Sequence, residues 1–190
     1  MIGVSDSGIK GGSGSAMGVE KGLRSSQIIF ENKLPLIQLI ESAGANLLRQ
    51  TDMFIKGGRS FANLAKMSAK GIPTIGVVHG SSTAGGAYQT GLSDYIIVVK
   101  KRSKIFLAGP PLLKASLGEI ATDEEIGGAD IHFAVSGLAE YMANDDAHAI
   151  EIARDVMKKI GWNDDFVSTQ KDDYKEPVYK TEELIGVVPV

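Results

Sequence analysis

Cysteine is absent from this chain of 190 residues. Its absence excludes disulfide bonds, thiol nucleophiles and zinc sites with cysteine ligands. No apolar run approaches the roughly 20 residues that a membrane-spanning helix needs, so we expect no membrane partner. The first residues, Met1 to Asp6, lack the basic start and apolar stretch of a signal peptide. These absences predict a cytoplasmic protein without a metal centre.

A strong charge of either sign is also missing. The net charge is -3 and no run of lysine and arginine stands out, which argues against a nucleic-acid partner. Hydrophobic residues make up 43% of the chain and charged residues 23%, as in ordinary globular proteins. The length suits a single sizeable core. We therefore expect one globular domain.

Glycine is abundant, with 23 residues, roughly twice its average share of about 7%. The glycines cluster near the start, at Gly57-Gly58, at Gly85-Gly86 and at Gly127-Gly128. Such clusters suggest places where the backbone approaches a ligand or another backbone closely.

Strand and helix patterns alternate along the chain, which predicts an α/β fold with a mostly parallel sheet covered by helices. The helix at 144–160 is expected to bury Ile150, Ala153, Met157 and Ile160. Residues 1–161 are expected to form the domain, and Ile2 and Val4 are expected to belong to the end of its first strand. Residues 162–190 are expected to form a polar linker or tail. The predicted strands are 2–4, 34–40, 73–79, 94–99 and 104–107. The other predicted helices are 16–32, 61–69, 85–92 and 111–117. The predicted loops are 6–15 and the tight turn 80–84.

Gly85 and Gly86 stand where a buried strand passes into a helix. The first amides of a helix have no partner within it, and the helix dipole favours negative charge there. Glycine at this point either permits close packing of helix on sheet or lets a ligand oxygen reach the amides. A second loop of small residues, Ser42 to Ala45, follows the preceding strand, at the sheet edge where open α/β sheets bind ligands. Two such loops can each aim one N–H at a single oxygen, which favours an oxyanion site.

A set of sequence blocks follows one another in a specific order along the chain: Ser5–Ser13, Glu41–Asn46, Gly80–Tyr88, Phe106–Leu112, Leu117–Glu119, Glu125–His132 and Val135–Gly137. Together they resemble the carboxyltransferase β subunits of biotin-dependent acyl-CoA carboxylases, closest to the propionyl-CoA and methylcrotonyl-CoA carboxylase type. The resemblance covers essentially the whole chain. It implies a crotonase-like (ClpP/crotonase) fold and matches the first of two tandem domains, without its N-terminal part.

The resemblance implies that this domain binds acyl-CoA, and that the second domain of a partner subunit binds carboxybiotin at a dimer interface. Carbon dioxide is released there, the biotin left behind takes the acyl α-proton, and the thioester enolate attacks the carbon dioxide. The implied partners are a biotin carboxylase and biotin carrier subunit, the carboxyltransferase C-domain and a second copy of the chain. A eukaryotic member would be expected in the mitochondrial matrix. The last residues, 177–189, resemble the connector into the second domain.

The same resemblance identifies Gly85 and Gly86 as the backbone-amide pair that holds the enolate. The sequence departs from the usual pattern at Ala43, Ser82 and Gln89, so the acyl group stays undefined. The residues implied to contact CoA and its thioester are Lys10, Gly11, Gly12, Ser13, Ser42, Ala43, Gly44, Ala45, Ala84, Ala87, Gly109 and Pro110.

Other catalytic interpretations fit the residues less well. A serine-protease triad would pair His79 with Ser81 or Ser82, but no acid is evidently placed to orient the histidine, which is expected to bond to backbone instead. A hydratase would need a carboxylate after the glycines, and the stretch 87–90 offers none. The loop 11–14 resembles a dinucleotide loop only weakly.

Three glutamates and two histidines are the remaining candidates for a catalytic or metal site. Glu119, Glu124 and Glu125 are the carboxylates that a hydratase would use. His132 and His148 lack metal-ligand spacing and are expected to be structural or interfacial. Two alternatives to the carboxyltransferase stay open: a related acyl-CoA decarboxylase, and a CoA-binding or assembly module without activity of its own.

Overall fold

The computed structural model describes residues 1–46, 48, 50–162 and 178–180. The chain divides into two compact units, Met1–Ile160 and Gly161–Val190. The first unit contains the helices and strands described below. Nearly all of the predicted linker or tail, 162–190, lies outside the described residues, and its role stays a prediction.

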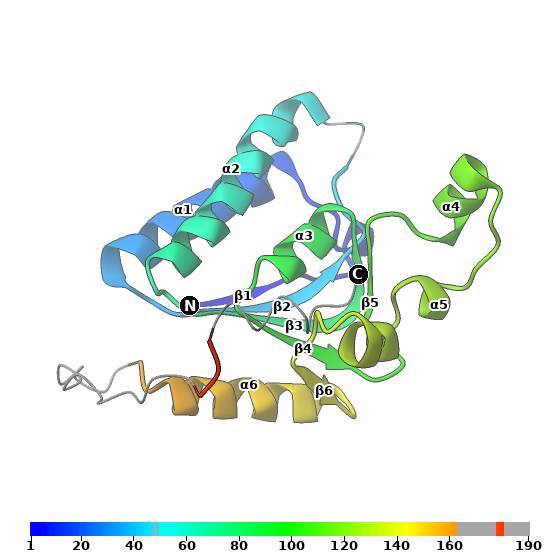
Figure 1. The fold of residues 1–190 in the computed structure, drawn as a ribbon. Coiled ribbons are helices and arrows are strands. Elements are labelled where there is room, and N and C mark those ends of the chain that lie inside the picture. Colours follow the sequence, from blue (N-terminus) through cyan, green and yellow to red (C-terminus); the bar gives the residue numbers. More distant parts are fainter. Residues whose placement is uncertain (47, 49, 163–177, 181–190) are drawn as a thin grey trace. The chain divides into compact units, whose positions relative to one another are not determined.

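A six-stranded sheet forms the centre of the first unit, and every pairing between its strands is parallel (Figure 1). The strand order is β1-β2-β3-β4-β6, with β5 paired to β3 outside this path. The parallel sheet predicted from the alternating pattern is therefore confirmed. The strands are β1 (Ile2–Val4), β2 (Leu36–Ser42), β3 (Thr74–Thr83), β4 (Tyr95–Val99), β5 (Lys104–Phe106) and β6 (Tyr141–Ala143).

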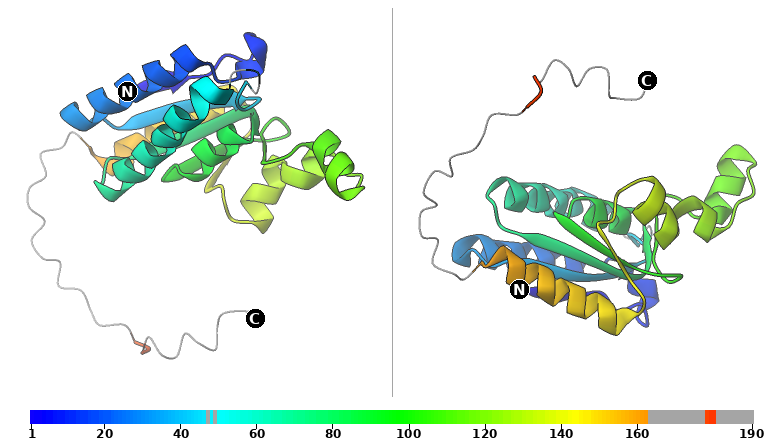
Figure 2. Two further views of the ribbon diagram at one scale, coloured as in Figure 1. Left: turned by 90° about the horizontal axis from the view of Figure 1, so that it is seen from above. Right: turned by 60° about the horizontal axis from the view of Figure 1, so that its bottom comes forward.

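Helices cover both faces of the sheet, as a parallel sheet of buried strands requires. Helices α1, α2 and α3 lie over one face and α6 over the other, as Figures 1 and 2 show from different directions. None of the helices within the described ranges combines the length and apolar character of a membrane span. The helices are α1 (Ala16–Asn32), α2 (Gln50–Ala69), α3 (Gly85–Gly91), α4 (Pro110–Leu117), α5 (Asp123–Gly127) and α6 (Asp146–Ile160), with a 3-10 turn at Lys10–Gly12 and a π-helix at Ile131–Val135.

Alternate residues of the central strands build two separate cores, because successive side chains of a strand point to opposite faces. Val78 is fully buried on the α3 face, and Val77 is almost fully buried on the α6 face. The α3-face core contains Ile40, Val78, Ala87, Ile96, Val98, Ile105, Ala129 and Ala139, and the α6-face core contains Ile75, Val77, Ile97, Val99, Ala143, Ala149, Ala153 and Val156.

Three expectations about local structure are wrong. Helix α2 begins at Gln50 rather than 61, so Gly57 and Gly58 lie inside a helix, and a Cβ atom on either would meet nothing within 4 Å. Strand β3 continues to Thr83, so 80–84 is not a tight turn. In α6, Ala153 is buried and Met157 and Ile160 pack against the core as expected, but Ile150 is 39% exposed, and the fully buried positions are Ala149, Ala153 and Val156.

An irregularity between β2 and β3 shapes the end of the sheet. Ile40 pairs with Val78, but the next pair is Ser42 with Ser82, so β3 contributes more residues than β2 between the two pairs. Beyond it, β3 pairs with β5 at Ser81–Thr83 instead of with β4. The end of β3 is thereby directed toward β5, and α3 starts from this end.

Candidate active site

Ala84 joins β3 to α3 in a strained conformation. Its φ is 51° and its ψ is -110°, a region that residues other than glycine rarely adopt. The Ala84 amide donates to the Phe106 carbonyl at 3.1 Å, and the Ala84 carbonyl accepts from the Tyr88 amide at 3.3 Å. These two bonds fix the direction in which α3 leaves the sheet.

The amides of Gly85 and Gly86 come next, and neither donates a hydrogen bond to another group in the described part of the chain. They are the first amides of α3, which have no acceptor within their own helix. The structure therefore leaves two adjacent N–H groups available to an external oxygen.

The two glycines have different surroundings. A Cβ on Gly86 would lie 3.2 Å from both the Ser42 Cβ and the Ser82 Oγ, which is crowded. A Cβ on Gly85 would meet only the Phe61 ring, at 3.5 Å, an ordinary contact. Close packing therefore accounts for Gly86 but does not account for Gly85.

The loop after β2 lies directly against this junction. A Cβ on Gly44 would come within 3.2 Å of the Thr83 carbonyl oxygen and 3.3 Å of the Ala84 Cβ. Gly44 has a φ of 91°, which favours glycine at this point. The structure therefore brings the predicted residues of the second loop, Ser42 to Ala45, next to the glycine pair.

The amides of this loop are largely engaged within the chain. The Gly44 amide donates to the Ser42 Oγ at 3.1 Å, and the Ala43 amide donates to the Gly11 carbonyl at 2.9 Å. The expectation that each loop aims one N–H at a shared oxygen is therefore wrong for Ala43 and Gly44. The available pair is formed by the successive residues Gly85 and Gly86 instead.

The loop after β1 supports the loop after β2. Gly12 has a φ of 69°, and a Cβ there would clash with the Glu41 carbonyl group. Lys10 also has a positive φ of 51°, is exposed, and makes no ion pair or side-chain hydrogen bond to another described residue. The predicted stretch from Lys10 to Ser13 thus carries an exposed lysine next to Gly11, whose carbonyl accepts the bond from the Ala43 amide.

An apolar pocket of about 510 Å³ opens beside α3. Of the predicted site residues only Ala87 lines it, while Gly109 follows the lining residue Ala108 and Pro110 begins α4. Sequence reasoning missed the other lining residues, although positions 87, 88 and 91 share one face of a helix. The lining is Ala87, Tyr88, Gly91, Leu92, Ile105, Phe106, Leu107, Ala108, Ile126, His132 and Leu138.

His79 differs from expectation. Its Nδ1 lies 3.9 Å from the Glu41 Oε2, so an acid does stand beside it, and its buried Nε2 has no hydrogen-bond partner among the described residues. The expected bond to backbone is therefore not found. Ser82 is fully buried and its hydroxyl pairs with Thr90 Oγ1 at 3.0 Å, which withholds it from a nucleophilic role.

The other acidic candidates act in local structure. Glu125 forms a capping box with Thr122 at the start of α5, in which the Thr122 amide and then its hydroxyl donate to the carboxylate. These bonds lower the pKa of the Glu125 carboxyl from its ordinary value. Glu124 pairs with Lys104, and Glu119 is exposed.

The histidines of the second half of the chain are also engaged. The ring nitrogens of His132 bond to Ser136 Oγ at 3.1 Å and to the Ile105 carbonyl at 2.7 Å. His148 Nδ1 accepts from the Asn144 amide at 3.2 Å. Within the described ranges no group of three or more potential ligand side chains is placed to hold a metal ion.

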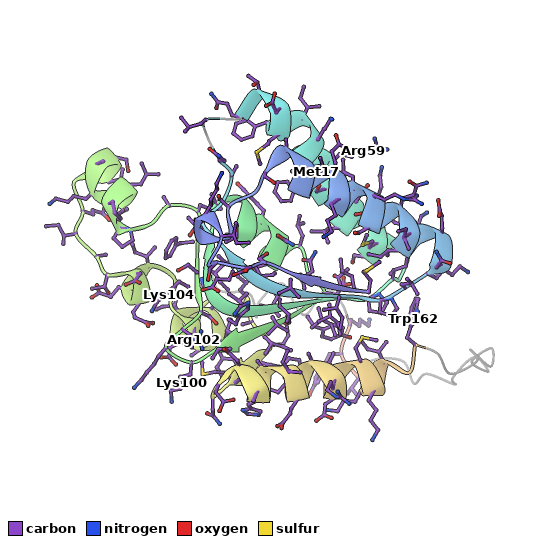
Figure 3. All side chains as sticks on the ribbon, turned by 180° about the vertical axis from the view of Figure 1, so that it is seen from behind. Met17, Arg59, Lys100, Arg102, Lys104 and Trp162 are labelled. Atoms are coloured by element: carbon purple, nitrogen blue, oxygen red, sulfur yellow. The ribbon has the colours of Figure 1, made fainter. Side chains whose placement is uncertain are left out.

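The basic turn after β4, residues 100–102, is distant in sequence from the loops after β1 and β2. A contact with α6 holds it in place. Figure 3 shows Lys100 and Arg102 near the start of α6, and Arg102 Nη1 donates to Asp146 Oδ2 at 2.7 Å. This pairing gives the turn a structural role.

A family model described as "Carboxyl transferase domain" matches residues 1–190. The chain belongs to this family. It is 48% identical over 189 residues to a Mycobacterium tuberculosis protein named "Probable biotin-dependent acyl-coenzyme A carboxylase beta2 subunit", with 100% of this chain and 35% of that protein covered. It is 47% identical over 192 residues to the mitochondrial methylcrotonoyl-CoA carboxylase beta chain of Dictyostelium discoideum, covering 100% of this chain and 32% of the relative.

The fold agrees with this assignment. The crystal structure of the geranyl-CoA carboxylase β subunit of P. aeruginosa matches with a TM-score of 0.79 and 52% identity, over 98% of this chain and 34% of that subunit. The crotonase-like α/β fold expected of this carboxyl transferase domain is thereby confirmed. The domain spans about a third of the length of these relatives.

Proposed function

We propose that this carboxyl transferase domain forms the acyl-CoA half of a biotin-dependent acyl-CoA carboxyltransferase. Gly85 and Gly86 hold the thioester oxygen of the acyl-CoA through their backbone amides. The observation that carries the proposal is that these adjacent amides lack partners in the described structure, within a chain of the carboxyl transferase family.

The amide pair suits the charge that develops in the reaction. Removal of a proton from the acyl α-carbon, or from a vinylogous carbon, leaves an enolate with negative charge on the thioester oxygen. Fixed N–H donors aimed at such an oxygen typically contribute about 3 kcal/mol each to stabilising the transition state. The strained turn at Ala84, held by the Phe106 carbonyl, keeps the donors in place before the charge appears.

The carboxylates that a hydratase would use do not offer a general base here. Residues 87–90 contain no carboxylate, and Glu124 and Glu125 are engaged with Lys104 and Thr122. Carboxybiotin on a partner domain would supply both the carboxyl group and the proton acceptor. The domain's own part is then to bind the acyl-CoA and to orient its α-carbon.

The neighbouring loops suit the rest of the ligand. Lys10 offers an exposed ammonium group for a CoA phosphate, and its loop packs on the Ser42–Ala45 loop through the bond between Ala43 and Gly11. A biotin carboxylase and biotin carrier subunit, a C-domain and a second copy of the chain complete the proposed assembly. Because the domain spans 35% of its M. tuberculosis relative, the second candidate function is a CoA-binding or assembly module that gives no turnover even when a C-domain is added.

The proposal is tested by comparing the affinity of the parent and of the Gly85→Val variant for acyl-CoA. A Cβ atom at Gly85 would meet only the Phe61 ring, at 3.5 Å, so we expect the variant to fold, and we expect the branched side chain to narrow the approach to the amide pair. We expect calorimetry with 3-methylcrotonyl-CoA to show binding at least about tenfold weaker than in the parent, or about 1.4 kcal/mol. Gly58→Val is the matched control, because it makes the same change in a helix with open space around it. Equal affinity in parent, variant and control would rule out the assignment of the pair.

Turnover separates the two candidate functions. We expect no carboxylation of 3-methylcrotonyl-CoA by this chain with a carboxylated biotin carrier alone, and carboxylation when a C-domain is added. Turnover by the chain alone would show that the site is complete without a partner.

A further inference from the structure

Helix α3 carries the amide pair but has little local stability of its own. It is seven residues long, and three of these residues are the glycines at 85, 86 and 91. Isolated helices of this length are unstable in water, and each glycine disfavours helix further. Contacts with the rest of the fold must therefore set the orientation of α3, and with it the orientation of the two amides.

Thr90 is the main buried anchor of this helix. The buried residues of α3 are Gly86, Ala87 and Thr90, and only Thr90 has a side chain larger than a methyl group. The larger Tyr88 is 54% exposed. Thr90 is fully buried, and its Oγ1 lies 3.0 Å from the Oγ of Ser82, which is fully buried too. A hydrogen bond between two hydroxyls is directional, whereas apolar contacts are not, so this bond constrains how α3 lies on the sheet.

Ser82 is well placed to hold the helix. It lies in β3 and is paired in register on both sides, with Ser42 of β2 and with Ile105 of β5. Its Oγ lies 3.2 Å from the position in which a Cβ atom of Gly86 would stand. The Ser82 hydroxyl therefore lies beside Gly86, in the first turn of α3, and bonds to Thr90, one turn further along.

The bond between Ser82 and Thr90 closes a loop of chain that contains the strained Ala84 and both glycines of the amide pair. The two bonded residues are eight positions apart. A strained backbone persists only where its surroundings over-determine it. The Phe106 carbonyl constrains the Ala84 amide on one side. The Ser82–Thr90 bond is a second constraint, because it fixes the helix that follows Ala84.

We infer that Ser82 and Thr90 are positioning residues for the amide pair. Their hydroxyl bond keeps the N–H groups of Gly85 and Gly86 in the orientation in which one thioester oxygen receives both hydrogen bonds. The inference rests on the proposed function and adds two buried side chains that act through the backbone. Loss of the bond should weaken acyl-CoA binding by about fivefold, the net contribution of one hydrogen bond.

Thr90 offers a matched pair of variants. Thr90→Val keeps the shape of the side chain and removes its hydroxyl, whereas Thr90→Ser keeps the hydroxyl and removes a methyl group. Ser82→Ala breaks the same bond from the β3 side. The double variant Ser82→Ala/Thr90→Val lacks both hydroxyls, so neither is left buried without its partner and part of the lost stability returns.

Thr74→Val is the control for an effect on stability alone. Thr74 is buried at the opposite end of β3, and its hydroxyl donates to Asp94 Oδ2 at 2.8 Å. The substitution is the same as at position 90 and also removes a buried hydrogen bond, but the amide pair follows the other end of the strand. We expect Thr74→Val to lower the urea midpoint and to leave acyl-CoA binding unchanged.

Three quantities are measured for each variant: the Kd of 3-methylcrotonyl-CoA by calorimetry, the urea midpoint, and the amide proton shifts of Gly85 and Gly86 in NMR. In the parent and in Thr90→Ser, we expect both amide protons to move downfield when the thioester binds, because they enter hydrogen bonds. In Thr90→Val, Ser82→Ala and the double variant, these movements should fall to about half or less, and binding should weaken by about fivefold in each. The loss of affinity should therefore follow the loss of the bond and not the urea midpoint.

Contrary results have separate meanings. If the double variant binds like the parent and keeps both shifts, or if affinity falls in step with the urea midpoint in all variants including Thr74→Val, the pair serves stability alone and the inference is overturned. An equal loss in Thr90→Ser and Thr90→Val would assign the effect to packing and overturn it too. In these cases the proposed function stands if Gly85→Val still weakens binding. If the parent does not bind 3-methylcrotonyl-CoA, the proposed function and the inference fail together.

Discussion

The side chain of Glu41 fills the space beside Gly80 in which a Cβ atom would stand, with its Cγ only 2.7 Å from that position. Glu41 sits in the irregular stretch of β2, and Gly80 in the facing stretch of β3. The same carboxylate lies 3.9 Å from the His79 ring through its Oε2. Glycine at 80 therefore allows an acidic side chain to lie across β3 at the end of the sheet.

This relationship predicts a coupling between the two positions. Gly80→Ala should lower the free energy of unfolding by up to about 1 kcal/mol, because the new methyl group forces the flexible Glu41 side chain to move. In a Glu41→Ala background most of that loss should disappear. Urea denaturation of the four forms gives the coupling energy as a double-mutant cycle. An equal loss in both backgrounds would show that Glu41 is not the obstacle.

The buried hydroxyl pair of Ser82 and Thr90 predicts a second coupling. Both side chains are fully buried and their oxygens are 3.0 Å apart. Ser82→Ala should reduce the free energy of unfolding by about 1–3 kcal/mol, because it leaves the Thr90 hydroxyl buried without its partner. Adding Thr90→Val should restore part of the loss. Thermal unfolding of the single and double variants tests this, and a strictly additive result would contradict it.

The two glycines of the amide pair should differ in their tolerance of alanine. Gly86→Ala brings a methyl group to 3.2 Å from Ser42 and Ser82 and should destabilise the fold by about 1–3 kcal/mol. Gly85→Ala makes an ordinary contact with Phe61 and should be neutral or stabilising by up to about 1 kcal/mol, since alanine favours helix. Chemical denaturation of both variants decides between them. Equal effects would mean that the packing difference between the two positions has no energetic consequence.

The cap of α5 should respond to acid. The Thr122 amide and then its hydroxyl stabilise the ionised Glu125 carboxyl and lower its pKa in the folded chain. The cap's contribution to stability is therefore present above the ordinary glutamate pKa, and it is lost as pH falls through the lowered folded value. The Thr122 amide resonance in NMR should titrate with a midpoint below that of glutamate in an unstructured peptide. Glu125→Gln should abolish this titration, and a midpoint at or above the peptide value would contradict the assignment.

Local signals in the sequence were sufficient for some elements. Helix α1 begins and ends where the pattern predicts, because Ser15 caps its first turn and apolar residues recur at helical spacing. The start of α2 was missed because Gly57 and Gly58 each oppose helix formation by about 1 kcal/mol. Burial of Met53, together with residues later in the helix, outweighs that preference.

The features of the candidate site also differ in whether local sequence could predict them. The position of the glycine pair at the start of a helix after a buried strand could be predicted, because a buried strand followed by small residues is a local pattern. The pocket and the Glu41–His79 contact could not, because they depend on strand register and on segments brought together only by the fold. Residues 80–84 resemble a turn, and the pairing of β3 with β5 holds part of that stretch as strand.

The hydrogen bond from the Ala84 amide to the Phe106 carbonyl ties the start of α3 to strand β5. The amide pair belongs to the backbone, whereas the pocket wall is made of side chains such as Leu107 and Leu138. Substitutions in that wall can change the pocket while leaving the amide pair untouched. The backbone site and the pocket in this domain would then vary independently during evolution.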